Sequence, residues 1–442
     1  MIEPDRARQR RRQVPLLPDA DPFLRTPADI ASIAPGTVIR SRPVELALFG
    51  MVRQRVRAWQ LAYRSNDLFS RPELAVTTVV TPSGAEPDPN RPLLLFQSAI
   101  DAITQRCAPS YALRHRASVS GSITRLEWPL IANALRRGWA VGIADHGGML
   151  GSFGAPREPG YRSLDGARAA LSFAPLGLDR RTPIGLWGYS GGGMASAWAA
   201  EMAPTYAPEL NIVGAALGAP VGDPGEVFLR LHGGRYSGFP LMVVAALRRL
   251  YPDLDEVITA NLLPAGQELL DEVERLAPLV ALLRLSGRNV DQYLRRPLEE
   301  ILGDPKVRGV IDDLRLGLSA PNCPLLVLQP VNDQVIHSAS VDAQVERYRD
   351  AGVHVTYLRD RLSDHFTLLP LSTSLSLGWL ADRIAGAPLP APSTRTVLST
   401  SAVSASWRGL LGVAGTALTV AVGGRLAGTN TPFTGPTIDR AA

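Results

Sequence analysis

The chain has 442 residues, which is more than one minimal domain requires and enough to bury a large core. Hydrophobic residues make up 45% of it and charged residues 20%, an ordinary balance for a globular enzyme. The formal net charge is +5, and basic residues are not gathered with aromatic residues on one element, so the sequence does not indicate nucleic-acid binding. Its two cysteines are too few and too separated for a zinc motif.

The N-terminal segment is rich in arginine, with five arginines between Arg6 and Arg12. We expect residues 1–17 to form a disordered, solvated tail, and the alternative is weak attraction to an anionic membrane surface. The apolar stretch that follows, at residues 14–17, is too short for a secretory signal. From this segment alone we expect the protein to be cytoplasmic or membrane-associated.

Residues 18–224 contain short apolar runs separated by Gly and Pro, which predict the strands of an α/β core. The run at 93–98 has the composition of a buried strand, and Asp101 follows it in a loop. On its own, Asp101 is interpreted as a helix N-cap. The last strand of this part is expected at 212–217.

The most informative motif is Gly-x-Ser-x-Gly at residues 188–192, directly after a short apolar run. It is typical of a nucleophile elbow, a sharp strand-to-helix turn that presents the hydroxyl of Ser190. Gly188 and Gly192 lack the Cβ atoms that would collide in such a turn. The turn also directs the N–H of Gly191 toward the oxygen of a tetrahedral intermediate. The alternative is that small residues merely let a helix pack closely on a strand.

From residue 225 to residue 318 the apolar spacing becomes helical, as in 241–251 and 268–276, and no strand is evident. We interpret this block as a helical cap or lid that is inserted into the core and lines an acyl-binding cavity. For any individual side chain, plain core packing is the alternative. We expect the core to resume over residues 319–388.

An acid should follow the serine in the chain, because a serine hydroxyl needs a base and a carboxylate that orients the base. The apolar run at 324–330 predicts a strand that is covered on both faces, and Asp333 comes directly after it. Asp333 also fits a turn former that bonds nearby backbone. Its position between a serine elbow and a later histidine favours the catalytic interpretation.

The base is expected last in the order Ser, acid, His. His354 lies within an alternating, strand-like run, whereas His365 follows that run in a polar loop that can reach the carboxyl edge of a parallel sheet. We therefore predict His365 as the base, and a solvated loop histidine is the alternative. Asp360 and Asp364 are rival acids, but both lie close to His365 in the sequence.

Residues 389–442 are expected to form a C-terminal tail with an apolar segment. The run 409–424 carries no charge and lies between Arg408 and Arg425. It is shorter than the roughly 20 apolar residues that span a bilayer. We interpret it as a docking helix or an interfacial anchor. The Arg-rich start and this apolar end together predict peripheral contact with an anionic membrane, and two loose tails are the alternative.

Several segments together resemble the secretory lipase family of α/β-hydrolases, the group of yeast lipase A and its actinobacterial relatives. The resemblance covers roughly residues 18–388 and includes the serine elbow. The other matching segments are Asp21-Pro22-Phe23, Pro35-Gly36-Thr37-Val38-Ile39-Arg40, Tyr63-Arg64-Ser65, Cys107-Ala108-Pro109-Ser110-Tyr111, Asp145-His146, 164–170 and Trp379-Leu380-Ala381-Asp382-Arg383.

The resemblance implies an α/β-hydrolase fold, a mostly parallel central sheet flanked by helices, and an extracellular location. It also implies that the N–H of Asp101 is the second oxyanion donor beside Gly191. In relatives the cysteine that corresponds to Cys107 is often in a disulfide, and here the other cysteine is Cys323. The sequence leaves open whether the two pair.

We therefore predict a serine carboxylester hydrolase with Ser190, Asp333 and His365 as catalytic residues. Within this class we predict a lipase that acts on triacylglycerol or long-chain esters in lipid catabolism. No cofactor or metal is required for this chemistry. An acyltransferase or a short-chain esterase with the same triad is the alternative within enzymes. A non-catalytic lipid-binding protein with the hydrolase fold is the alternative of another class. Acyl length, alcohol preference and oligomeric state are not encoded in any motif.

Overall fold

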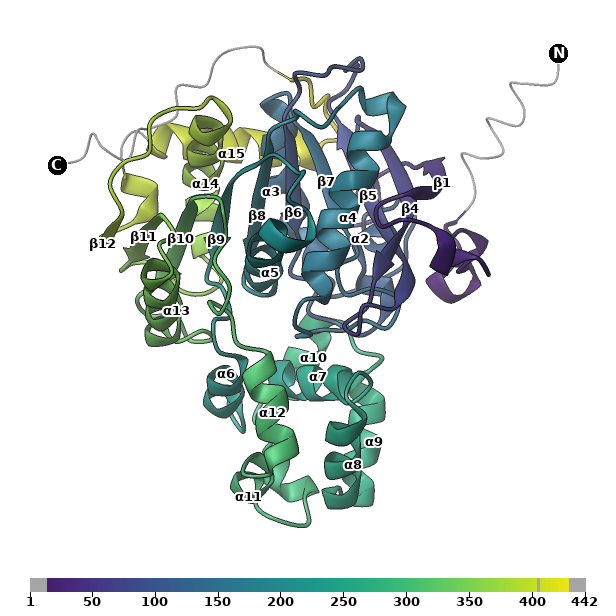
Figure 1. Cartoon of the computed structure of the whole chain (residues 1–442), viewed down its shortest axis with the longest axis vertical. Helices are drawn as coiled ribbons and strands as arrows, with labels where there is room; N and C mark the ends of the chain where they lie inside the picture. Colours follow the sequence, from purple (N-terminus) through teal and green to yellow (C-terminus); the bar gives the residue numbers. More distant parts are fainter. Residues whose placement is uncertain (1–13, 404–405, 429–442) are drawn as a thin grey trace.

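A ten-stranded sheet crosses the upper part of the molecule in the order β1-β4-β5-β7-β6-β8-β9-β10-β11-β12 (Figure 1). The structure is a computed structural model, which describes residues 14–403 and 406–428. The strands from β7 to β12 in this order are parallel, and β1, β4 and β5 extend the sheet in antiparallel orientation. The strand bounds are β1 Val38–Pro43, β4 Arg57–Asn66, β5 Pro72–Thr81, β6 Leu93–Gln97, β7 Ala140–Ala144, β8 Ile184–Tyr189, β9 Ile212–Gly218, β10 Leu325–Pro330, β11 Val355–Asp360 and β12 Ser393–Val397. A separate two-stranded hairpin is made of β2 Ala47–Leu48 and β3 Val52–Arg53.

The central strands are buried along their whole length because helices cover both faces of the sheet. Every residue of β6, β7, β8 and β10 is buried. This agrees with the continuous apolar runs from which strands were predicted at 93–98 and 324–330. The carboxyl ends of these parallel strands lie at one edge of the sheet, where α/β proteins place their ligand-binding loops.

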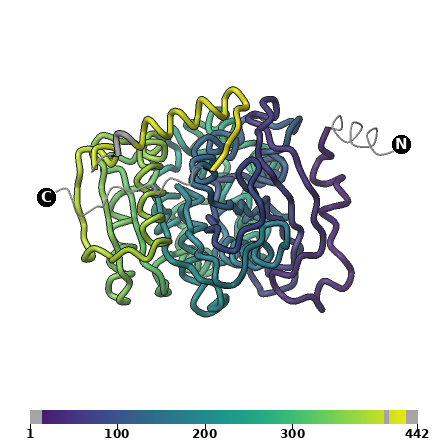
Figure 2. The backbone as a smooth tube through the Cα atoms, turned by 90° about the horizontal axis from the view of Figure 1, so that it is seen from above, coloured from purple at the N-terminus to yellow at the C-terminus, as the bar shows by residue number. Residues whose placement is uncertain are grey.

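Helices α4, α5 and α13 cover one face of the sheet, and helices α3, α14 and α15 cover the other. In the view from above, α15 runs along one long side of the core (Figure 2). The bounds are α2 Pro109–Ala112, α3 Ile123–Arg136, α4 Glu158–Ser172, α5 Gly191–Tyr206, α13 Ser338–Asp350, α14 Leu368–Ile384 and α15 Ser406–Ala421. Short 3-10 helices are η1 Pro18–Ala20, η2 Pro22–Leu24, η3 Ile30–Ser32, η4 Gln105–Cys107, η5 Ala174–Leu176, η6 Val290–Tyr293 and η7 Thr400–Ala402.

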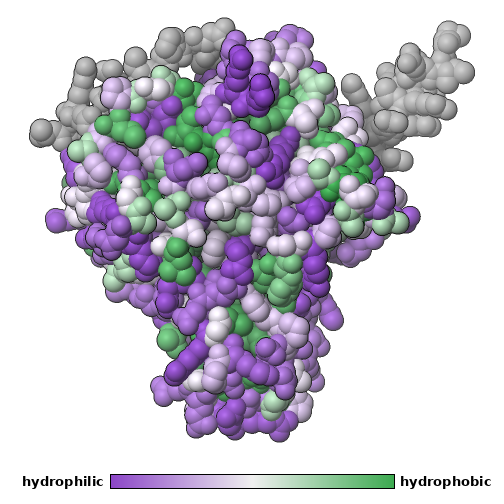
Figure 3. Space-filling model, in the orientation of Figure 1, coloured by the Kyte–Doolittle hydropathy of each residue, from purple (hydrophilic) through white to green (hydrophobic). Residues whose placement is uncertain are grey.

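The segment between β9 and β10 forms a helical lobe beyond the carboxyl edge of the sheet, below the core in Figure 1. Its helices are α6 Pro224–Leu231, α7 Gly238–Leu247, α8 Pro252–Asn261, α9 Pro264–Val273, α10 Pro278–Arg284, α11 Leu298–Leu302 and α12 Pro305–Asp313. Polar residues predominate on the lobe's outer surface in the view of Figure 3. The helices predicted over 241–251 and 268–276 correspond to α7 and α9, each shifted by about one turn.

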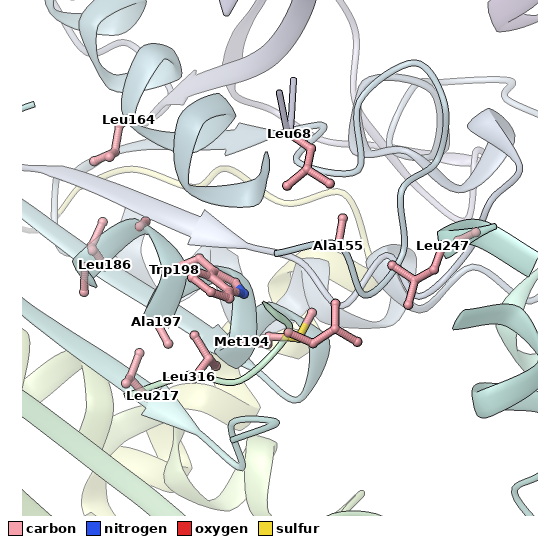
Figure 4. Packing of buried hydrophobic residues seen from close by; sticks show 14 of the residues in the cluster. Leu68, Ala155, Leu164, Leu186, Met194, Ala197, Trp198, Leu217, Leu247 and Leu316 are labelled. Atoms are coloured by element: carbon pink, nitrogen blue, oxygen red, sulfur yellow. The ribbon is translucent and has the colours of Figure 1, made fainter. Parts of the chain in front are cut away.

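The lobe and the core share one hydrophobic cluster. Buried side chains from α5 and the sheet belong to the same packed cluster as α7 and its neighbours. Figure 4 shows members of this cluster from α5 (Met194, Trp198), from β8 (Leu186) and from the lobe (Leu247). Because apolar burial stabilises by about 25 cal/mol per Å², this shared cluster holds the lobe against the carboxyl edge of the sheet.

The C-terminal segment differs from the expected tail. Strand β12 pairs with β11 at the edge of the sheet, so the core extends past residue 388. Helix α15 packs on α3 and α14 and buries Val413, Thr416 and Val420. The apolar residues of this helix serve packing on one face, whereas Leu411 and Leu418 on its other face are about two-thirds exposed (66% and 67%). No helix in the described ranges is both long and apolar enough to cross a membrane. Most of the predicted Arg-rich tail lies outside the described residues.

Candidate active site

Ser190 occupies a sharp turn between β8 and α5. Its backbone has φ 53° and ψ −120°, a conformation that L-residues rarely adopt. A side chain at Gly188 would collide with the carbonyl of Gly192, and one at Gly192 would collide with the carbonyl of Gln97. Only glycine therefore fits at both flanking positions, as the predicted elbow requires. The turn lifts the half-buried serine to the carboxyl edge of the sheet.

The predicted base and acid lie in a chain of hydrogen bonds with this serine. Nε2 of His365 is 2.9 Å from Oγ of Ser190, and Nδ1 of His365 is 2.8 Å from Oδ2 of Asp333. Both Asp333 and His365 are buried. Because the carboxylate is an acceptor, the proton belongs on Nδ1 and the lone pair of Nε2 faces the serine hydroxyl. This is the tautomer that removes a proton from a nucleophile.

Further contacts fix the positions of Asp333 and His365. Oδ1 of Asp333 accepts hydrogen bonds from the backbone N–H groups of Val335 and Ile336, both at 2.7 Å. The hydroxyl of Tyr189 donates to the carbonyl of His365 at 2.6 Å. Helix α6 of the lobe also reaches this site, because Arg230 donates to the carbonyl of Asp333 at 2.8 Å. These contacts hold the carboxylate and the imidazole in register.

The rival residues have other partners. His354 lies directly before β11, and its Nε2 is 2.6 Å from the carbonyl of Pro390. Asp360 accepts hydrogen bonds from the backbone of Leu362 and Ser363. Asp364 likewise accepts from nearby backbone N–H groups in its own loop.

Asp101 lies beside the elbow rather than at the start of a helix. Its φ of 44° lies in the left-handed region, and no helix of the described chain begins there. Its carboxyl oxygen lies against Gly191, where an added Cβ would collide with it. Burial, and then the nearby charge of Glu127, raise the pKa of Asp101 to about 7. Gly191 is the first residue of α5, so its N–H has no partner within the helix and lies at the positive end of the helix dipole.

Two cavities meet at Ser190. The first has a volume of about 60 Å³, and its lining includes Asp101, Ser190, Gly191, Met194, Phe239 and Val243. It adjoins an apolar cavity of about 120 Å³ inside the lobe, because Pro224, Phe228 and Val243 line both. Ser190 also lines a larger cleft of about 330 Å³, whose other lining residues include Leu126, Glu127, Leu282, His365 and Phe366.

Proteins similar to this chain are found among lipases. Residues 113–391 match the family model described as secretory lipase. The chain belongs to the secretory lipase family. It is 34% identical to lipase A of Arthroderma benhamiae, with 84% of this chain and 81% of that protein covered. Candida antarctica lipase A, solved in its closed state, superimposes with a TM-score of 0.83 at 26% identity over 94% of this chain and all of that one.

One relative in this family bears on activity. The chain is 47% identical to a Mycobacterium tuberculosis protein named as a probable inactive lipase, over 93% of this chain and 92% of that protein. In the present chain, Ser190, His365 and Asp333 make the hydrogen bonds given above. The chain shares the α/β-hydrolase fold and the family with these relatives.

The structure answers the question that the sequence left open about the two cysteines. Cys107 and Cys323 are both free and buried. Cys107 packs in a small cluster beside Ile100, whereas Cys323 belongs to the large cluster that joins the core and the lobe. Burial raises the pKa of each thiol to about 12, so neither is a nucleophile at neutral pH.

Arg230 and Glu127 support the site and were not predicted from the sequence. Arg230 is one of many arginines, and no local pattern ties a residue of α6 to the loop of Asp333. Glu127 lies in α3 between Leu126 and Trp128, and a carboxylate within an apolar stretch was the available signal.

Proposed function

We propose that this protein is a serine carboxylester hydrolase, and within that class a lipase that acts on triacylglycerol or other long-chain esters in lipid catabolism. The observation that carries the proposal is the continuous hydrogen-bonded chain from Ser190 through His365 to Asp333. A strained elbow beneath the serine and two cavities around it support the same reaction class.

In the first half of the reaction, Nε2 of His365 takes the hydroxyl proton of Ser190 while Oγ attacks the ester carbonyl. Asp333 keeps the imidazole oriented and stabilises its positive charge. The N–H groups of Gly191 and Asp101 hold the oxyanion of the tetrahedral intermediate. The imidazolium then gives its proton to the departing alcohol, and an acyl-enzyme remains. Water repeats these steps with His365 as base and releases the acid.

The helical lobe between β9 and β10 is the cap that was predicted over 225–318, and it lines the acyl site. An acyl chain bound at Ser190 enters the small cavity beside Met194 and continues past Val243 into the apolar cavity of the lobe. That inner cavity is lined almost entirely by aliphatic side chains, which favour a hydrocarbon chain by about 0.8 kcal/mol per buried methylene. The alcohol leaves through the wider cleft beside Phe366. The cap at 225–318 therefore determines the preference for acyl-chain length.

The test is hydrolysis of p-nitrophenyl esters of increasing chain length, with Ser190→Ala as the control. We expect measurable turnover that depends on Ser190 and a preference for longer acyl chains. Absence of turnover in the folded wild-type protein would instead favour the non-catalytic lipid-binding alternative. The mycobacterial relative is named as a probable inactive lipase. Transfer to added alcohols faster than hydrolysis would favour the acyltransferase alternative, and flat or falling rates with chain length the short-chain esterase.

Contact with a lipid surface belongs to the same proposal. The outward side chains of α15 include Leu411 and Leu418 with no charged residue between them. Such a face favours shallow insertion into the interface of an anionic membrane, aided by the net positive charge of the chain. Membership of the secretory family supports an extracellular site of action.

A further inference from the structure

The loop that carries Asp101 holds an unfavourable backbone conformation. It runs from the end of β6 at Gln97, and at Asp101 the chain has φ 44°, in the left-handed region that favours glycine. The N–H of Asp101 can serve as an oxyanion donor only while this conformation persists. Because a strained residue costs on the order of 1–3 kcal/mol, other contacts must hold the loop.

Those contacts converge on the first two residues of the loop. The backbone N–H of Ala99 donates to Oε1 of Glu127 at 3.0 Å, and the hydroxyl of Ser98 donates to Oε2 of the same carboxylate. On the other side, Nε2 of His146 is 2.7 Å from the carbonyl of Ser98. One carboxylate of α3 therefore accepts from two successive residues of the loop.

Glu127 is an unusual residue to find at this place. Its side chain is 1% exposed, and no arginine, lysine or histidine of the described chain forms an ion pair with it. Burial raises the pKa of Glu127 to about 7, whereas the hydrogen bonds from Ser98 and Ala99 act in the opposite direction. A buried carboxylate without a cationic partner lowers the free energy of unfolding, and an apolar residue at the same position would not carry this cost. It also lines the cleft that contains Ser190 and His365.

We propose that Glu127 is the positioning residue of the oxyanion hole: its carboxylate fixes Ser98 and Ala99 so that the N–H of Asp101 points at the oxyanion. This inference rests on the proposed function, because it assigns a task within the same reaction. Glu127 touches no reacting atom. It acts through the loop, and its effect falls on the transition state rather than on binding of the acyl chain, which uses cavities that Glu127 does not line.

The test compares ligands that do and do not form an oxyanion. A medium-chain trifluoromethyl ketone adds to the serine and places a negative oxygen in the hole, whereas the alcohol of the same chain length occupies the site without one. For Glu127→Ala we expect affinity for the ketone and kcat/KM for an ester to fall together, by between about 10-fold and 100-fold, below the full loss of one donor. KM and affinity for the alcohol should change by less than about threefold.

In Glu127→Gln, the affinity for the ketone and kcat/KM for the ester should both stay within about threefold of wild type. The amide oxygen of the glutamine can accept from Ala99, and its NH₂ group can donate to Ser98. The matched control is Glu201→Ala. Glu201 is also buried and accepts from the N–H of Gly317 and the hydroxyl of Tyr348, but its contacts are remote from the loop. Glu201→Ala should lower the thermal stability of the protein and leave its affinity for the ketone unchanged.

Two outcomes would overturn the inference. Unchanged ketone affinity in folded Glu127→Ala would show that the loop keeps its shape without the carboxylate. Equal losses for ketone and alcohol would show general damage to the site. If Glu127→Ala does not fold, Ser98→Ala removes one of the two contacts at little cost in volume, and a selective loss of ketone affinity of about three- to tenfold is expected. A wild-type protein that neither hydrolyses esters nor binds the ketone would contradict the proposed function instead.

Discussion

Val243 stands where the cavity at Ser190 joins the inner cavity of the cap, since it lines both. Val243→Trp should close this passage while leaving the triad contacts in place. An acyl chain that places four methylenes in the inner cavity gains about 3 kcal/mol, from about 0.8 kcal/mol for each. Loss of that gain corresponds to a decrease of about 200-fold in kcat/KM for long esters.

Short esters that end before the passage should lose less than about threefold, because they bury no methylene beyond it. The assay is kcat/KM across a p-nitrophenyl ester series for wild type and variant. Leu283→Trp is the matched control, since this side chain of α10 is 82% exposed and lines neither cavity. A uniform decrease across all chain lengths, or no change for long esters, would refute the assignment of the inner cavity to the acyl chain.

Three further outcomes are expected. Asp333→Asn and His365→Ala should each lower kcat by about 10³-fold or more with the fold retained, measured by ester hydrolysis and circular dichroism, and near-normal turnover in either would contradict the triad. The Asp101 carboxyl, whose pKa is raised to about 7, stays protonated in the fold at pH values where the unfolded chain has already ionised it, so its contribution to stability falls as pH rises from about 4 to 7. The free energy of unfolding of Asp101→Asn should therefore rise by up to about 4 kcal/mol relative to that of wild type between about pH 4 and pH 7, measured by chemical unfolding. A difference that does not depend on pH would contradict the raised pKa of Asp101. Leu411→Gln with Leu418→Gln should reduce co-sedimentation with anionic vesicles severalfold without changing hydrolysis of a soluble ester, and equal sedimentation would confine α15 to packing.

The parts of the fold with strong local signals could be predicted from sequence. The elbow was predictable because glycines on both sides of Ser190, directly after an apolar run, are typical of a sharp strand-to-helix turn. The strands before Asp101 and Asp333 were predictable because a strand covered on both faces is apolar at every position. The position of His365 followed from the strand before it, since loops after parallel strands meet at one edge of the sheet.

The parts that depend on distant contacts were not predictable. Strand β12 is half-buried at the sheet edge, and its polar, mixed composition gives no period-2 pattern strong enough to distinguish it from a tail. The pairing of Glu127 with Ala99 joins a helix to a loop 28 residues earlier, which no spacing rule reveals. Asp101 illustrates the same limit: an aspartate after a strand is interpreted as a cap, and only the folded chain shows its positive φ beside Gly191.

In the proposed mechanism, Ser190 is a nucleophile that His365 and Asp333 activate. The most direct measurement is mass spectrometry of the full chain after reaction with a fluorophosphonate, followed by peptide mapping. We expect one adduct per chain, located on the peptide with Ser190, with loss of ester hydrolysis in proportion to labelling and no adduct in Ser190→Ala. A folded wild-type protein that takes up no label, or takes it up at a different serine, would contradict this role of Ser190.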